Sequence, residues 1–79
     1  MTDLEKLLRA ETEKWTRKLE RELPKAKASE NGAAYLMNIQ AYVKDSKHFA
    51  EKGDLIRSFE AIIWAWAWLE ITRELGLLD

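Results

Sequence analysis

The most suggestive chemical group in this chain contains its single histidine. Asp45 and His48 form an Asp-x-x-His pattern, a variant of the Glu-x-x-His pattern found in the di-metal sites of helical bundles. Such sites need a second pattern of this kind and further inward-facing carboxylates, and the sequence has neither. At about 100° per residue, Asp45 and His48 also point away from the apolar side of their segment. We therefore expect a surface histidine near a helix end, with no metal site and no cofactor.

A second group comprises the carboxylates Asp45, Glu60 and Glu70, which could act as an acid and a base. Such catalysis needs a cleft and a perturbed pKa, and a small helical bundle offers little room for a cleft. Arg73 follows Glu70 by three residues, so an ion pair on a helix surface is the simpler expectation. The chain has no cysteine, which excludes disulfides, thiolate zinc sites and a cysteine nucleophile. We therefore predict no catalytic residues.

Cations gather between residues 14 and 27. On a helical wheel, five of them fall on one flank: Lys14, Arg17, Lys18, Arg21 and Lys25. A basic helix flank can bind a phosphate backbone. No aromatic residue lies within this flank to stack on bases, and the whole chain has a net charge of -1. We expect a solvated face, and nucleic-acid association through this flank is the alternative function.

Three helices would position these side chains, over residues 3–27, 32–52 and 54–75. The first begins at a capping box, in which Thr2 and Glu5 satisfy each other's backbone amides. The second has one clean apolar stripe at helical spacing. Short connections between three helices favour an up-down-up order. The sequence thus predicts an all-α, antiparallel three-helix bundle.

Glycine and proline mark where these helices end. Pro24 predicts a kink or a stop late in the first helix, because its ring disfavours helix before it and removes an amide donor. Gly53 is expected in the left-handed conformation that follows a helix, and Asp54 is expected to cap the next one. Helices two and three should therefore form a tight hairpin. Gly76 is expected to end the third helix.

The length and composition indicate a single small domain over residues 1–79. A domain of this size buries only about two-thirds of its unfolded surface, so association or very good packing must add stability. The longest apolar run covers residues 61–69, whereas a membrane span needs about 20 residues. The acidic, amphipathic start is unlike a signal peptide. We expect a cytoplasmic protein.

The third helix carries two apolar stripes on roughly opposite sides. The main stripe comprises Leu55, Ile56, Phe59, Ile62, Ile63, Trp66 and Leu69. The second stripe comprises Trp64, Trp68, Ile71 and Leu75. The predicted core of the bundle comprises Trp15, Leu19, Ile39, Tyr42, Phe49, Phe59, Ile62, Ile63 and Trp66. Two neighbouring helices cannot readily cover both stripes, so the second is predicted to be an interface, most simply of a twofold homodimer.

A set of residues in fixed register runs through the second and third helices. It comprises Tyr42, Asp45, Phe49, Gly53-Asp54-Leu55, Phe59-Glu60-Ala61, Trp64-Ala65-Trp66 and Leu69-Glu70. In these residues the chain resembles an archaeal family known as domain of unknown function 357, over roughly residues 29 to 76. The resemblance implies a small helical bundle and an archaeal, cytoplasmic source. It implies no activity, so no site residue is carried over from it.

Together these patterns predict a non-enzymatic module for protein–protein interaction or self-association. Its binding surface would be the aromatic face of the third helix, and its partner a second copy or another protein. The first alternative is the nucleic-acid association described above. The second is a metal or hydrolytic site that uses Asp45, His48 and Glu60.

Overall fold

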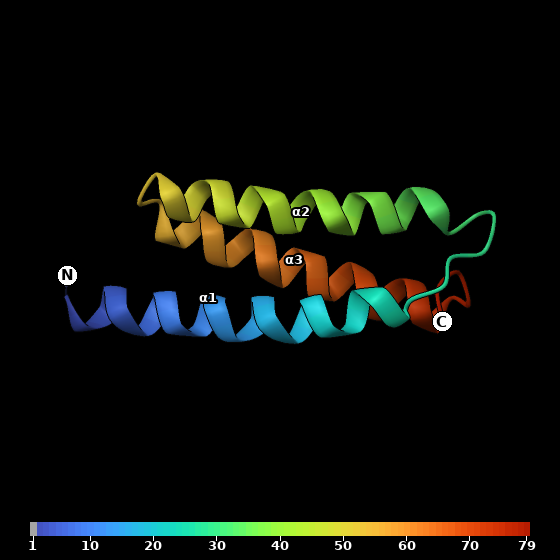
Figure 1. The fold of residues 1–79 in the computed structure, drawn as a ribbon, viewed down its shortest axis with the longest axis horizontal. Coiled ribbons are helices and arrows are strands. Elements are labelled where there is room, and N and C mark those ends of the chain that lie inside the picture. Colours follow the sequence, from blue (N-terminus) through green and yellow to red (C-terminus); the bar gives the residue numbers. More distant parts are fainter. Residues whose placement is uncertain (1) are drawn as a thin grey trace.

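The computed structural model describes residues 2–79 as three long helices and one short 3-10 turn. These are α1 (Asp3–Glu22), η1 (Leu23–Lys25), α2 (Ala33–Glu51) and α3 (Leu55–Glu74). The helices run up, down and up, and they form a rod of 44 × 17 × 17 Å (Figure 1). The predicted all-α, antiparallel three-helix bundle is therefore confirmed.

The start and end of α1 follow from local chemistry. The Thr2 hydroxyl accepts a hydrogen bond from the Glu5 amide at 3.1 Å, and the Glu5 carboxylate accepts one from the Thr2 amide at 3.4 Å. The helix ends at Glu22 rather than at the predicted residue 27. Pro24 lies in the 3-10 turn that follows, and Ala26 is already extended, with ψ of 125°. The proline therefore acts as a stop, because its ring and missing amide end the α-helical ladder.

The corner between α2 and α3 is built by the Gly-Asp pair, as the sequence predicts. Gly53 has a φ of 80°, and its amide donates to the carbonyl of Ala50 at 3.0 Å. The amide of Asp54 donates to the carbonyl of Phe49 at 2.9 Å, which completes a Schellman motif. The Asp54 carboxylate then accepts from the Arg57 amide at 3.2 Å and so caps α3. The Gly53-Asp54 pair therefore ends α2 and begins α3.

The carboxyl-terminal residues turn back onto the connection between α1 and α2. Gly76 ends α3 with a φ of 74°. Beyond it, the carbonyl of Leu77 accepts a hydrogen bond from the Ser29 amide at 3.1 Å. The amide of Asp79 donates to the carbonyl of Lys27 at 3.0 Å. These bonds pair two segments that lie far apart in the sequence, and they close that end of the bundle.

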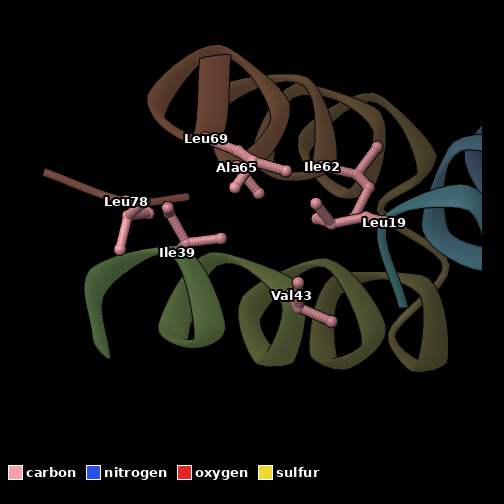
Figure 2. Close-up of a cluster of buried hydrophobic side chains, with 7 residues drawn as sticks. All are labelled: Leu19, Ile39, Val43, Ile62, Ala65, Leu69 and Leu78. Atoms are coloured by element: carbon pink, nitrogen blue, oxygen red, sulfur yellow. The ribbon is translucent and has the colours of Figure 1, made fainter. Parts of the chain in front are cut away.

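This tail contributes to the core, although no sequence pattern predicted that it would. Leu78 is only 3% exposed and lies beside Ile39 in the buried cluster (Figure 2). Gly32 is buried under the same tail, and a Cβ at this position would collide with the carbonyl oxygen of Leu77. The close approach of the two backbones therefore requires glycine at residue 32.

The third helix is the central one, because it contacts both α1 and α2, whereas α1 and α2 approach each other little within the described residues. Its most buried face carries many small side chains. These are Ser58, Ala61, Ala65 and Thr72. Small side chains let two helices pack closely, and the hydroxyls of Ser46 on α2 and Ser58 on α3 lie only 3.2 Å apart. Leu55, Ile62 and Leu69 are buried on this face as well, and the remaining large apolar side chains of α3 lie on its flanks and its outer side.

The predicted core residues divide according to this geometry. Leu19, Ile39 and Ile62 have no exposed surface, and they form the buried cluster with Val43, Ala65, Leu69 and Leu78 (Figure 2). Trp15, Tyr42 and Trp66 are half-buried and pack against this cluster. Phe49 and Phe59 are also half-buried. Ile63 departs from the prediction, since it is 39% exposed, and Ile56 of the same stripe is 65% exposed. The buried face of α3 is therefore rotated away from Ile56 and Ile63, toward the side of the helix that carries Ser58, Ala61, Ala65 and Thr72.

The buried tail leads to a test of stability. Replacing Leu78 with alanine should lower the free energy of unfolding by about 2–5 kcal/mol, because a buried leucine leaves a cavity when truncated. The control is Leu7→Ala on α1, where the side chain is 65% exposed and a change within about 0.5 kcal/mol is expected. Chemical denaturation of the two variants measures both values. Equal effects would contradict the tail's place in the core.

Candidate functional site

The side of α3 that neither neighbour covers is a continuous apolar surface. We name it the outer face, and it comprises Ile56, Glu60, Ile63, Trp64, Ala67, Ile71 and Leu75. On a helical wheel these residues share one side of the helix, and the charged residues Arg57 and Glu74 fall on the same arc as Glu60. The exposed fractions are 54% for Trp64, 42% for Ile71 and 66% for Leu75. The outer face thus presents large apolar side chains along nearly the whole helix.

Three of the four residues predicted to form an interface lie on the outer face, and Trp68 does not. Trp68 is half-buried and packs against the core cluster. Its ring lies 5.8 Å from that of Tyr35 on α2, with 31° between the planes. Trp68 therefore joins α3 to α2, and it borders the outer face rather than belonging to it.

The opposite border of the outer face is formed by Trp66 and α1. The Trp66 indole Nε1 donates to the carbonyl oxygen of Trp15 at 2.9 Å, and the two rings meet edge to face with centroids 5.8 Å apart. The two tryptophans, Ile63, Ala67 and Glu70 line a shallow hollow of about 230 Å³. This hollow continues the outer face toward α1.

An ion-pair network ties the far ends of α1 and α3 together. Arg73 does not pair with Glu70 as the sequence suggested; its Nη1 lies 3.3 Å from Glu22 Oε1, and its Nε donates to the carbonyl of Asp79 at 3.1 Å. Lys25 Nζ lies 3.2 Å from the other Glu22 oxygen. The hydrogen bond and charge of Lys25, and then those of Arg73, hold the pKa of Glu22 below its ordinary value.

The predicted basic flank of α1 has an aromatic neighbour, Trp15, that was not predicted there. The Lys14 and Lys18 ammonium groups lie 5.2 and 4.7 Å from the centre of the Trp15 ring. Lys14 also pairs with Glu11 at 3.0 Å, and this bond is the main cause of the lowered pKa of Glu11. The rest of the flank comprises the exposed residues Arg17, Arg21 and Lys25. Lys14 and Lys18 therefore already occupy the Trp15 ring, where a stacked base would have to bind.

The candidate metal and acid–base residues lie on the surface. Asp45 and His48 are exposed on α2, and the His48 ring lies 6.1 Å from that of Phe49. Glu60 and Glu70 are exposed on α3. Among residues 2–79, no three histidine, cysteine or acidic side chains are placed so that they could hold a metal ion together.

A groove lies between α1 and α2, and no pattern in the sequence predicted it. It consists of two adjoining hollows of about 540 and 240 Å³, and the Glu20–Lys47 ion pair crosses it at 3.5 Å. The hydroxyls that line it already donate to backbone carbonyls of their own helices or, for Ser46 and Ser58, of each other's helix. These hydroxyls belong to Thr12, Thr16, Ser46 and Ser58. The hydroxyls that line the groove are therefore already engaged by the fold itself.

Comparisons with known proteins agree with this bundle. The sequence model of a family described as proteins of unknown function, DUF357, matches residues 11–78. The chain belongs to the DUF357 family. Its fold is similar to the crystal structure of protein AF1782 from Archaeoglobus fulgidus, of the same family, with a TM-score of 0.89 and 47% sequence identity. That match covers 98% of this DUF357 chain and 97% of the other. No curated protein matches the chain.

A helix that crosses a bilayer in this DUF357 protein would need about 20 predominantly apolar residues. Within the described residues, no helix is both long and apolar enough to span a membrane.

The ion-pair network predicts a pH dependence of stability. Because the pKa of folded Glu22 lies below the ordinary value of 4.5, its ionised form stabilises the fold above that pH, and this contribution is lost as the pH falls through the folded-state pKa. Glu22→Gln should therefore lower the free energy of unfolding at pH 7, and the gap to the natural protein should close below about pH 4. Denaturation at several pH values measures this, with Glu51→Gln as the control. A gap that stays constant down to pH 2 would contradict it.

Proposed function

We propose that this protein is a non-enzymatic interaction module whose binding surface is the outer face of α3. The observation that carries the proposal is the exposure of Trp64, at 54%, in line with four other exposed apolar residues. Isolated apolar residues on a surface are common, but a contiguous patch of this kind marks a contact site. The proposal places the protein in the cytoplasm, as the sequence analysis predicts.

The composition of the outer face supports binding rather than catalysis. Its centre consists of tryptophan, isoleucine and alanine side chains, which supply neither a nucleophile nor a base. Glu60 is its charged member, and Arg57, Glu70 and Glu74 lie on or beside it toward the two ends; all four are exposed. An apolar centre with a polar rim is the usual arrangement of a protein–protein interface, and tryptophan is enriched among its strongest contacts.

A charge placed in the middle of the outer face tests the proposal. Labelled natural protein should sediment, either purified or in an extract of its own cells, as a species heavier than the 9.3 kDa chain. Trp64→Glu should return it to the mass of the single chain, because a buried, unpaired carboxylate is costly at an interface.

Met37→Glu is the matched control for this substitution. Met37 is 70% exposed on α2, away from the outer face, so this variant should keep the heavier mass. Circular dichroism of both variants checks that the helices remain. The proposal is wrong if the natural protein sediments as a single chain in both conditions, or if Trp64→Glu sediments as the natural protein does.

A further inference from the structure

We propose that the outward side of α1 binds the phosphate backbone of a double-stranded nucleic acid, at a surface separate from the outer face of α3. The site is the basic flank, which comprises Lys14, Arg17, Lys18, Arg21 and Lys25. The sequence by itself favours a solvated face here. Three features of the structure change that expectation: the direction in which the neighbouring acidic side chains point, the cations that lack a partner, and the spacing of the cations along the helix.

The basic flank lies on the side of α1 that faces away from the bundle. At about 100° per residue it is opposite Thr12 and Leu19, which are the buried residues of this helix. The helix itself forms one long edge of the rod (Figure 1). Between residues 14 and 25, the wheel places no acidic and no apolar residue among the five cations. The flank is therefore a convex surface that offers positive charge and little else.

The acidic residues of the same stretch point to the two sides, toward the neighbouring helices. Glu20 pairs with Lys47 of α2 at 3.5 Å, and Glu22 pairs with Arg73 of α3 at 3.3 Å. Glu22 is shared with Lys25 of the flank. Each of these carboxylates thus meets a cation from outside α1, which leaves more of the positive charge of the flank uncompensated.

The central cations of the flank have no acidic partner. Lys14 and Lys25, at its two ends, pair with Glu11 and Glu22 at 3.0 and 3.2 Å. Among residues 2–79, three members of the flank take part in no ion pair, and these are Arg17, Lys18 and Arg21. Their charges are available to an anionic partner without the loss of a bond inside the protein.

Part of the flank borders a shallow hollow of about 270 Å³. The hollow is lined by Lys18, Arg21, Glu22, Lys25 and Trp66. Lys18 and Arg21 lie about one turn apart, and both belong to the unpaired cations. The Glu22 carboxylate in this hollow is already held by two cations. The hollow therefore gives a phosphate group a place beside Lys18 and Arg21.

The spacing of the cations suits a polymer of phosphates. They fall on four successive turns of the helix, about 5.4 Å apart, so that the flank spans about 16 Å. Over this length one strand of a duplex places about five phosphates, at ~3.4 Å along its axis for each. When α1 lies along such a strand, every unpaired cation has a phosphate within reach of its long side chain.

The composition of the flank favours a phosphate backbone over an acidic protein or a membrane. Protein interfaces rely on buried aromatic and apolar anchors, and a helix that lies on a membrane buries an apolar face. The flank has neither, whereas a phosphate backbone is bound through positive charge. Proteins that bind single strands stack bases on aromatic rings. The Trp15 ring is already occupied by Lys14 and Lys18, so a duplex is the form that fits.

Salt-dependent binding to labelled duplexes tests the proposal. Fluorescence anisotropy measures the affinity of the purified chain for DNA and RNA duplexes of about 20 base pairs, at about 50 to 200 mM salt. If the three unpaired cations each meet one phosphate, a plot of log affinity against log salt concentration should have a slope of about −3. Duplexes of unrelated sequence should bind equally well, because backbone contacts carry no sequence information.

The double variant Arg17→Gln, Arg21→Gln removes two of the three contacts. Its slope should change to about −1, and its affinity at low salt should be about tenfold lower. The matched control is Lys52→Gln, Arg57→Gln, at exposed positions of the corner between α2 and α3. Both variants change the net charge from −1 to −3, since each loses two cations. The control should bind as the natural chain does, and circular dichroism checks that both variants remain helical.

Three results would overturn the proposal. The first is the absence of salt-sensitive binding to either duplex at about 100 μM protein, which leaves the flank a solvated face. The second is an equal loss of affinity in the two double variants, because net charge rather than the flank then governs binding. The third is binding to vesicles of phosphatidylcholine and phosphatidylserine without binding to either duplex, which assigns the flank to a membrane surface. Binding to either duplex with the expected loss in Arg17→Gln, Arg21→Gln supports it, and the tighter duplex identifies the nucleic acid.

The proposal stands apart from the function proposed for the outer face. Trp64→Glu leaves the basic flank intact, so this variant should bind duplexes within about twofold of the natural chain once its own added charge is screened by salt. Loss of duplex binding in Trp64→Glu at about 200 mM salt, with the helices retained, would place the contact on α3 and overturn the assignment to α1.

Discussion

The packing of this bundle depends on the close approach of α2 and α3 at a pair of serines. The Ser46 hydroxyl donates to the carbonyl of Ser58 at 2.7 Å, and the Ser58 hydroxyl donates to the carbonyl of Ser46 at the same distance. Both residues are buried, so each satisfies a polar group that would otherwise be costly inside the fold. Such contacts are available only to small side chains, and Ala61 and Ala65 continue the small-residue face along α3. Among the bulky side chains of α3, Leu55, Ile62 and Leu69 are buried beside these small residues, and the others lie on its flanks or on the exposed outer face.

The sequence predicted the helices and their ends well because those signals are local. A capping box and a Gly-Asp corner each act within a few residues, and both are found where they were expected. Pro24, predicted to kink or stop the first helix, stops it, so that the helix ends at Glu22 rather than at residue 27. The buried side of α3 was harder to predict, because periodicity arguments weight large apolar residues. Here Ser58 and Ala65 occupy the interior, while Ile56 and Ile63 remain outside.

Other features could not be predicted because they join distant parts of the chain. Leu78 is a core residue only because the tail pairs with the loop around Ala28. Nothing in the sequence of either segment indicates which segment it pairs with. The Arg73–Glu22 pair likewise required the register of α1 against α3, whereas spacing along one helix favoured Glu70. For the candidate site, the sequence identified the outer face through Trp64, Ile71 and Leu75. The predicted borders of the outer face were wrong on both sides, because each apolar stripe of the third helix was predicted to be buried or exposed as a whole.

The three tryptophans at alternate positions of α3 show how far the fold of one chain explains its sequence. Trp66 donates to the Trp15 carbonyl and joins α3 to α1, and Trp68 packs on Tyr35 and the core and joins α3 to α2. Each therefore has a structural reason to be a tryptophan. Trp64 lies between them on the outer face, where more than half of its surface meets solvent. A single folded chain would be served there by any good helix former, so the large aromatic side chain is best explained by a surface that another molecule covers.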